Sequence, residues 1–422
     1  MNDPTVLLRA LPLEVFETPQ SDDSWARSPL LKISDAMLIQ SVAAAIAPPK
    51  SRAQSSFLLH APLELLGRAW LLPYVSPDKR DAARRRIAEI AARYAREGTE
   101  IEAHPRSYAT IDRALVELQE ALRAGDVDTV DGALLFLLPR VSFERLRAAL
   151  AEEMIPALGA AGHAPILLMT LPGAIRYASA SVCALLRAPL RALALEADQR
   201  LTWMDSVDPH AVNRESSLFE SLAAPPNVET TSLSIAPTML AVERDGYAAQ
   251  RLAGATSAMT VRHAERALLQ VAALSMLQDD PEHAPYGWSH CLTLPQAILA
   301  QSDVVSDQIR VVRIAATHVL GFRATLGRAR LQEPYSPPPR STELVLEGEP
   351  NDVAAQVFHA ATNQYNAIGK ELAARAAVHA DAHLAKYTMG CLLAGARDPD
   401  IAPLYLAAAA YLGAWWNRRQ RA

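Results

Sequence analysis

The sequence predicts an all-α protein, and three observations carry that prediction. Half of the 422 residues are hydrophobic and only 6% are aromatic, with alanine and leucine dominant, a composition that favours closely packed helices. Signals that start helices recur along the chain. No long segment alternates apolar and polar residues with the period of two that a half-buried strand requires. We therefore expect a single large multi-helix domain over residues 1–422, with long irregular loops.

The clearest helix signal is the stretch "SPDKRDAARRRIAEIAARYAREG". Ser76 is placed as an N-cap, Pro77 as the first helical residue and Gly98 as the stop. Apolar spacing predicts further helices at 34–47, 53–71, 111–124, 142–158, 179–197, 261–277, 294–300, 306–320, 352–379 and 401–416. We expect the helices within about 34–197 and 240–416 to pack around one central site.

Three stretches rich in proline and polar residues are predicted to be loops. They span residues 225–238, 279–287 and 332–352, and their prolines disfavour helix. The last is long enough to act as a lid or a strap. Within it, "TELVLEG" suits either a short strand or an extended connection.

Net charge and cysteine spacing limit the binding partners and the cellular compartment that we expect. The net charge of −5 gives no electrostatic footprint for nucleic acid. Cys183, Cys291 and Cys391 lie far apart in the sequence, which is typical of reduced core thiols in a cytoplasmic protein. The N-terminal stretch lacks a basic segment followed by an apolar run, so we expect no secretory signal.

Two stretches without charged residues are candidates for membrane spans. Residues 154–175 are interrupted by several prolines and glycines, and residues 402–416 are short. A spanning helix needs about 20 apolar residues. We therefore expect a soluble protein with no membrane partner.

Four of the 11 histidines stand in apolar surroundings. They are His60 in "FLLHAPLELLG", His163 in "GAAGHAPILLMTLPG", His290 in "YGWSHCLTL" and His383 in "DAHLAKYT". Each alone is more often a core histidine, but neutral imidazoles are also the commonest metal ligands. Glu64, one turn after His60, has three open roles: to bind a metal, to orient His60 by a hydrogen bond or to face water, and we expect the last.

A lysine accompanies the last of these histidines. Spacings of four and three place His379, His383 and Lys386 on one face of a helix, on its apolar side. A buried ammonium is costly unless it is paired or loses its charge. Two explanations stay open: Lys386 extends past Tyr387 to the surface, or it is neutral beside a metal. We place His379 outside the ligand set, because Arg375 and Asp381 suggest a more solvated position.

These stretches resemble the questin oxidase-like family. The family has a histidine before an Ala/Leu-rich run, a second after a Gly-rich turn, a third in an aromatic-then-HxxT pattern, and a C-terminal DxHxxK motif. The four quoted stretches match these motifs in order, from about Phe57 to Met389. The run after His163 departs from the family pattern, so we expect a different substrate pocket there.

The resemblance implies an all-α oxygenase that uses O2 to cleave a ring C–C bond of an aromatic polyketide or quinone, a reaction described as Baeyer–Villiger-like and associated with NADPH. It also implies a mononuclear non-haem Fe(II) site. Carried over by motif, its ligands are His60, His163, His290, His383 and a carboxylated Lys386. A lysine carbamate would supply the anionic oxygen that four imidazoles lack.

Side chains beside these motifs are candidates for the substrate pocket. We predict Trp288, Tyr177 and Tyr387 as catalytic residues, with Arg176 beside Tyr177 to suit a flat, acidic substrate. No GxGxxG follows a strand, so a built-in Rossmann site for NADPH is not supported. Spacing does not choose among iron, manganese and zinc. A zinc hydrolase using the same residues and a metal-free helical binding protein stay open as alternatives, as does the oligomeric state.

Overall fold

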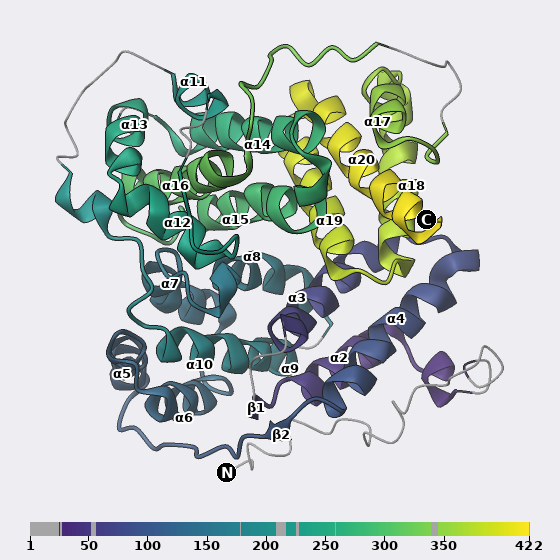
Figure 1. Ribbon diagram of the computed structural model, residues 1–422. Coiled ribbons are helices and arrows are strands. Elements are labelled where there is room, and N and C mark those ends of the chain that lie inside the picture. Colours follow the sequence, from purple (N-terminus) through teal and green to yellow (C-terminus); the bar gives the residue numbers. More distant parts are fainter. Residues whose placement is uncertain are drawn as a thin grey trace. The chain divides into compact units, whose positions relative to one another are not determined.

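The computed structural model describes residue 25 and residues 28–51, 56–177, 179–207, 217–224, 228–257, 259–338 and 345–421. The all-α prediction is confirmed: nearly every regular element is a helix (Figure 1). The only sheet within these residues has two short antiparallel strands, β1 (Lys50–Ser51) and β2 (Thr99–Glu100). No helix among them is long and apolar enough to cross a membrane.

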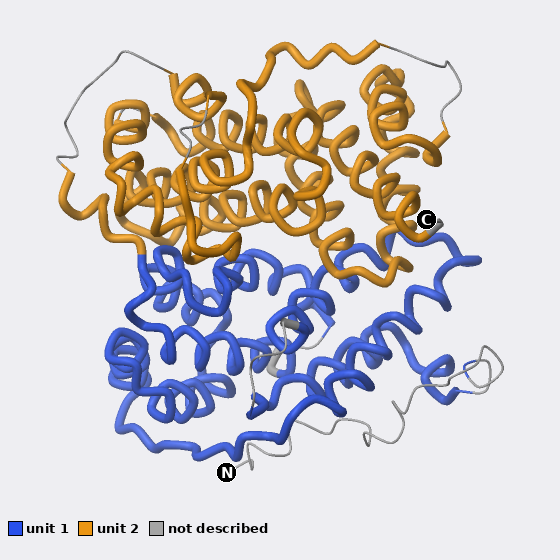
Figure 2. The backbone as a smooth tube through the Cα atoms, viewed as in Figure 1, with its two compact units in different colours: residues 1–200 blue, residues 201–422 orange. Residues whose placement is uncertain are grey.

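The chain divides into two units, residues 1–200 and 201–422 (Figure 2). The helices of each unit pack mainly within that unit, and each unit is therefore described by itself. The single domain that the sequence predicts stays a prediction.

Unit 1 is built from helices α2 to α10. Their bounds are α2 (Asp35–Ile46), α3 (Ser56–Leu71), α4 (Pro77–Ala95), α5 (Ile111–Ala124), α6 (Val127–Leu137), α7 (Phe143–Met154), α8 (Ala164–Ile175), α9 (Ser179–Cys183) and α10 (Arg187–Leu195). Helix α3 packs against α2, α4 and α8, and α5 packs against α6 and α7. Ser76 is the N-cap residue of α4 and Pro77 its first residue, as predicted, although the Ser76 side chain makes no capping hydrogen bond. Side-chain caps also start α2 at Ser34 and α7 at Ser142.

Unit 2 is built from helices α11 to α20. Their bounds are α11 (Leu218–Ala223), α12 (Ile235–Arg244), α13 (Tyr247–Thr256), α14 (Val261–Gln278), α15 (Ser289–Leu299), α16 (Gln308–Leu326), α17 (Pro350–Phe358), α18 (Tyr365–Val378), α19 (Ala382–Arg397) and α20 (Ala402–Arg421). Every residue of α15 is buried, because α14, α16 and α19 all pack on it. This helix forms the centre of unit 2.

Helices α15 and α19 approach closely at Gly390. The Gln296 side-chain amide on α15 donates to the Gly390 carbonyl on α19 at 3.0 Å. A Cβ atom at Gly390 would lie only 3.0 Å from Gln296 Oε1 and 3.1 Å from Leu292 Cδ2. The small residue therefore sets the spacing between the two helices that carry His290 and His383.

Several element predictions were wrong. The predicted loop 279–287 forms a 3₁₀ turn (Pro281–His283) and a π-turn (Ala284–Trp288). Its prolines sit in the first turns of these elements, where the missing N–H costs no hydrogen bond. The predicted loop 225–238 ends early, because α12 begins at Ile235. Residues 342–344 of "TELVLEG" lie outside the described residues, and 345–348 form no strand.

The predicted helix 352–379 is three elements. Helix α17 ends at Phe358, a 3₁₀ turn spans Thr362–Gln364, and α18 ends at Val378. The predicted helix ranges also omit α6, α8, α11, α12 and α13. In α6 the buried residues run without a gap from Thr129 to Leu134, so the sequence shows no separate apolar stripe.

The uncharged stretch 154–175 is also broken. A turn at Ala160–Gly162 separates α7 from α8.

The prediction of core thiols is confirmed: Cys183, Cys291 and Cys391 are free and buried.

Candidate metal-binding histidines

Two histidines of unit 1 lie edge to face. His60 is on α3, and His163 immediately precedes α8, which packs against α3. Their ring centroids are 4.4 Å apart with planes at 68°. Their ligand nitrogens lie within 4.8 Å of each other. Nitrogens bound to one transition metal at about 2.1 Å are separated by about 4.2 Å at most. At most a small side-chain rotation is therefore needed for the pair to share an ion.

A left-handed turn positions His163. Ala160 and Ala161 each have φ of 52° and Gly162 has φ of 67°, a region that residues with a Cβ seldom adopt. The Glu196 carboxylate holds the turn by accepting from the Ala160 N–H at 2.8 Å. The Ala160 carbonyl accepts from His163 Nδ1 at 3.1 Å. Because a carbonyl only accepts, Nδ1 carries the proton and Nε2 carries the lone pair.

The structure corrects the expectation for Glu64. This residue is 9% exposed and does not face water. Its Oε1 accepts from Arg68 Nε at 2.9 Å and from Nη2 at 2.6 Å, and Arg68 is fully buried. A buried guanidinium needs a carboxylate beside it. Glu64 is therefore held as the counter-ion of Arg68, one turn after His60.

Two histidines of unit 2 form a second pair. His290 is the second residue of α15 and His383 the second residue of α19. Their ring centroids are 5.1 Å apart with planes at 75°, and both residues are buried. The pair lies at the N-terminal ends of two helices that the Gln296–Gly390 contact holds together further along. The two helices therefore run in the same direction at this point.

The π-turn at Ala284–Trp288 orients His290. His290 Nδ1 donates to the Tyr286 carbonyl, four residues earlier in the turn. The Trp288 indole N–H donates to the Asp280 carbonyl at 3.1 Å and so closes the turn. The Tyr286 ring packs edge-on against His383, with centroids 4.8 Å apart and planes at 87°. The turn thus contacts both histidines of this pair, in keeping with the frequent use of π-turns at functional sites.

The Nδ1 atoms of three of these histidines face an oxygen atom. For His163 and His290 it is a backbone carbonyl, and for His383 it is Oδ1 of Asp381, at 3.3 Å. Metal-binding histidines almost always present one nitrogen to such an oxygen and the other to the metal. The donor set therefore fits a transition metal bound through Nε2 atoms. The sequence does not reveal these oxygen partners, although Asp381 and Tyr286 stand two and four residues before their histidines.

Lys386 is buried, with 2% of its surface exposed. It lies three residues after His383 on α19, and its neighbours on this helix from Ala382 to Cys391 are buried as well. The alternative in which its side chain extends to the surface is therefore wrong. Burial favours the neutral amine over the ammonium.

His379 does not share a helix with His383. Helix α18 ends at Val378, and Asp381 caps a new helix, so the predicted stripe of three is wrong at its first member. His379 Nδ1 accepts from the Asp381 N–H at 3.0 Å, and its Nε2 lies 2.9 Å from the Gln420 amide. These contacts join α18, α19 and α20.

The three predicted catalytic residues occupy different surroundings. Trp288 is fully buried in the π-turn. Tyr387 is fully buried on α19, and burial raises its pKa well above the usual value, with the Cys391 thiol adding to the shift. Tyr177 is half-buried beyond the end of α8, and its hydroxyl accepts from Arg176 at 3.1 Å. Because α8 has 12 residues, about 18 Å separates its two ends. Catalytic roles for these residues stay predictions.

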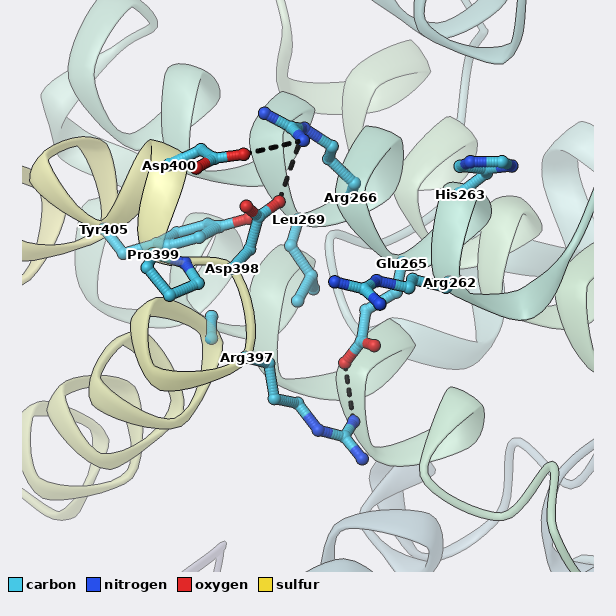
Figure 3. Close-up of a pocket in the computed structure, with 11 residues that line it drawn as sticks. Arg262, His263, Glu265, Arg266, Leu269, Arg397, Asp398, Pro399, Asp400 and Tyr405 are labelled. Carbon is cyan, nitrogen blue, oxygen red and sulfur yellow. Dashed lines mark hydrogen bonds and ion pairs between the residues drawn. The ribbon is translucent and has the colours of Figure 1, made fainter.

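A pocket of about 240 Å³ on unit 2 contains none of the predicted site residues (Figure 3). Arg266 pairs there with Asp398 at 3.3 Å, and Arg397 pairs with Glu265 at 2.7 Å. His263 lines this pocket and is exposed. Facing charges thus neutralise one another across the pocket.

Comparisons of this chain with protein-family models, with curated proteins and with solved structures found no match. The resemblance to questin oxidase-like proteins therefore rests on the quoted motifs alone.

Proposed function

We propose that this protein is a metal-dependent oxidoreductase of the oxygenase type, in which His60, His163, His290, His383 and Lys386 bind one Fe(II) ion. The observation that carries the proposal is the orientation of the imidazoles. Three of them turn Nδ1 to an oxygen atom, and two edge-to-face pairs form, one within each unit. Histidines kept only for packing have no need of a shared nitrogen orientation.

Lys386 completes the donor set as a carbamate in this proposal. The neutral amine of a buried lysine attacks CO2, a C–N bond forms, and the nitrogen releases one proton. The product is an anionic oxygen ligand in place of a cation. Four neutral imidazoles bring no negative charge to a dication. The carbamate would therefore supply the one negative charge of the ligand set.

The oxygenase activity follows from the resemblance to the questin oxidase-like family. A bound ferrous ion would supply the affinity for O2 and the one-electron chemistry that oxidation of an aromatic ring requires. The substrate class in this proposal is an aromatic polyketide or quinone, with NADPH as electron donor. The protein's share is to orient the imidazoles, to exclude water and to hold a phenolic proton at Tyr387.

Nitric oxide tests this proposal without knowledge of the substrate. Protein purified without oxygen is loaded with Fe(II), and NO is added as a stand-in for O2. We expect the half-integer-spin EPR signal of a non-haem iron–NO adduct. The signal should be lost in His383→Ala and kept in His379→Ala, a histidine of the same segment whose two nitrogens contact protein groups.

Three results would contradict the proposal. Absence of the NO signal after stoichiometric iron uptake would show that the iron has no position for O2. Retention of zinc in preference to iron, with ester or lactone hydrolysis, would favour the zinc hydrolase. Failure to bind any metal would leave a helical binding protein.

A further inference from the structure

Asp381 stands where α19 begins and contacts His383 twice. Its Oδ1 accepts from the backbone N–H of His383 at 2.8 Å, which makes it the N-cap of the helix. The same Oδ1 lies 3.3 Å from His383 Nδ1. One carboxylate oxygen therefore faces both the backbone and the imidazole of a single residue.

A cap alone does not require this arrangement. Ser34, Thr110 and Ser142 cap helices of the same protein with a neutral hydroxyl. Asn is also as good an N-cap as Asp. The charge of Asp381 is thus unnecessary for starting α19, and its position beside an imidazole calls for another explanation.

The surroundings of His383 restrict its ring. Asp381 faces Nδ1, and the Tyr286 ring packs edge-on against the imidazole with centroids 4.8 Å apart. The Asp381 side chain is 19% exposed, so water screens its charge only in part. Among the histidines whose Nδ1 partner is described above, His163 and His290 face neutral carbonyls, whereas His383 faces a carboxylate.

We propose that Asp381 is a positioning residue for the metal site: it keeps the proton of His383 on Nδ1, directs Nε2 to the metal and makes Nε2 a stronger donor. A carboxylate beside the N–H of a metal-bound imidazole fixes its tautomer and raises its basicity. This inference rests on the proposed function, because it requires His383 to be a ligand.

The test separates charge from capping with Asp381→Asn. The amide oxygen keeps the N-cap but is a neutral and weaker acceptor for the imidazole N–H. Metal-free wild type and variant are titrated with Co(II), whose visible absorption reports its ligands. We expect about 10–100-fold weaker Co(II) binding and a shifted absorption band in the variant. The Tm of the metal-free protein should not change.

Two further variants serve as controls. Asp307→Asn changes the N-cap of α16, where the Asp307 carboxylate accepts from the Arg310 N–H. No histidine contact of Asp307 occurs within the described residues, so this variant should leave Co(II) binding unchanged. Asp381→Ala removes cap and charge together, so it should lose Co(II) affinity and also lower the Tm.

The outcomes are distinguishable. Unchanged Co(II) affinity and band in Asp381→Asn would overturn the inference while leaving the metal site intact. A metal-free Asp381→Asn protein as destabilised as Asp381→Ala would show a purely structural role and would also overturn it. A wild type that binds no Co(II) would instead refute the proposed function, and the inference with it.

Discussion

At the scale of single residues, histidines in similar apolar sequence surroundings differ in the hydrogen-bond partners of their imidazoles. His318 is as buried as His163, yet its Nδ1 has no hydrogen-bond partner within the described part of the chain. Burial lowers its pKa to about 3. His163, by contrast, has its Nδ1 fixed by a carbonyl. The carbonyl that fixes Nδ1 thus distinguishes His163 from the equally buried His318.

Replacing His318 should stabilise the protein. Methionine has a similar volume and no polar nitrogen, so His318→Met removes a buried group that lacks a partner. We expect a gain of about 1 kcal/mol in the free energy of unfolding at pH 7. Chemical denaturation of both proteins measures it, and a loss of stability would show that the imidazole makes a favourable contact.

The same residue should make stability depend on pH. Its pKa is lowered in the folded protein, so the unfolded chain takes up the proton first as the pH falls below about 6.5. The free energy of unfolding is therefore unaffected by protonation of this residue above about pH 6.5 and decreases as the pH falls below it. Between pH 7 and pH 5 the wild type should lose about 2 kcal/mol more than His318→Met. Parallel acid dependences in the two proteins would contradict this account.

At the scale of elements, helix spacing and turn type place the histidines. The π-turn provides the carbonyl for His290, and Gly390 lets α15 and α19 approach. In both cases the course of the backbone determines where the imidazoles of His290 and His383 lie.

Gly390→Ala tests the helix spacing. The added Cβ would lie 3.0–3.3 Å from three atoms of α15, so the helices must separate slightly. Gly413→Ala on α20 is the matched control, because its Cβ would meet nothing within 4 Å. We expect Gly390→Ala to be about 1–3 kcal/mol less stable than the control. Equal denaturation midpoints would show that the contact is loose.

Tyr286→Leu and Tyr286→Phe test the ring against His383. Phenylalanine keeps the edge-to-face contact, whereas leucine removes it. We expect Co(II) binding close to that of the wild type in Tyr286→Phe and about 10-fold weaker binding in Tyr286→Leu. Co(II) titration measures the difference, and equal affinities would show that the ring only covers the surface.

Local signals in the sequence predicted most helices well but not their breaks. Helix α5 begins and ends where predicted, because Thr110 caps it and Gly125 ends it in the left-handed conformation. The break at His379 was missed, since Asp381 reads equally well as a polar residue inside a helix. The two turns at Pro281–Trp288 were missed, because a proline predicts a loop unless it occupies the first turn of a helical element, as Pro281 and Pro285 do.

Burial of the candidate site was easier to predict than its contacts. The apolar stretches correctly indicated that His163, His290 and His383 are buried. For Lys386, burial was one of two open alternatives, and the structure shows it buried. The oxygen atoms that face Nδ1 could not be predicted, because a carbonyl four residues away reaches the ring only through an unusual turn. The Glu64–Arg68 pair was missed although its spacing of four is a common helical ion pair.

At the scale of the whole molecule, a bound metal should stabilise the fold. An ion that binds only the folded state at 100 times its Kd adds about 2.7 kcal/mol to the free energy of unfolding. Anaerobic Fe(II) should therefore raise the Tm of the wild type by a few degrees, and a chelator should reverse the shift. Calorimetry with and without iron measures it, and an equal shift in His383→Ala would point to binding elsewhere.

The central claim is that the four histidines and Lys386 bind one metal ion, and metal content tests it most directly. Mass spectrometry of anaerobically purified protein should find one iron per chain. The iron should be lost in Lys386→Ala and kept in His379→Ala. Two ions per chain, each lost with a different histidine pair, would contradict a single site. A wild type that stays metal-free after iron loading would contradict the account as a whole.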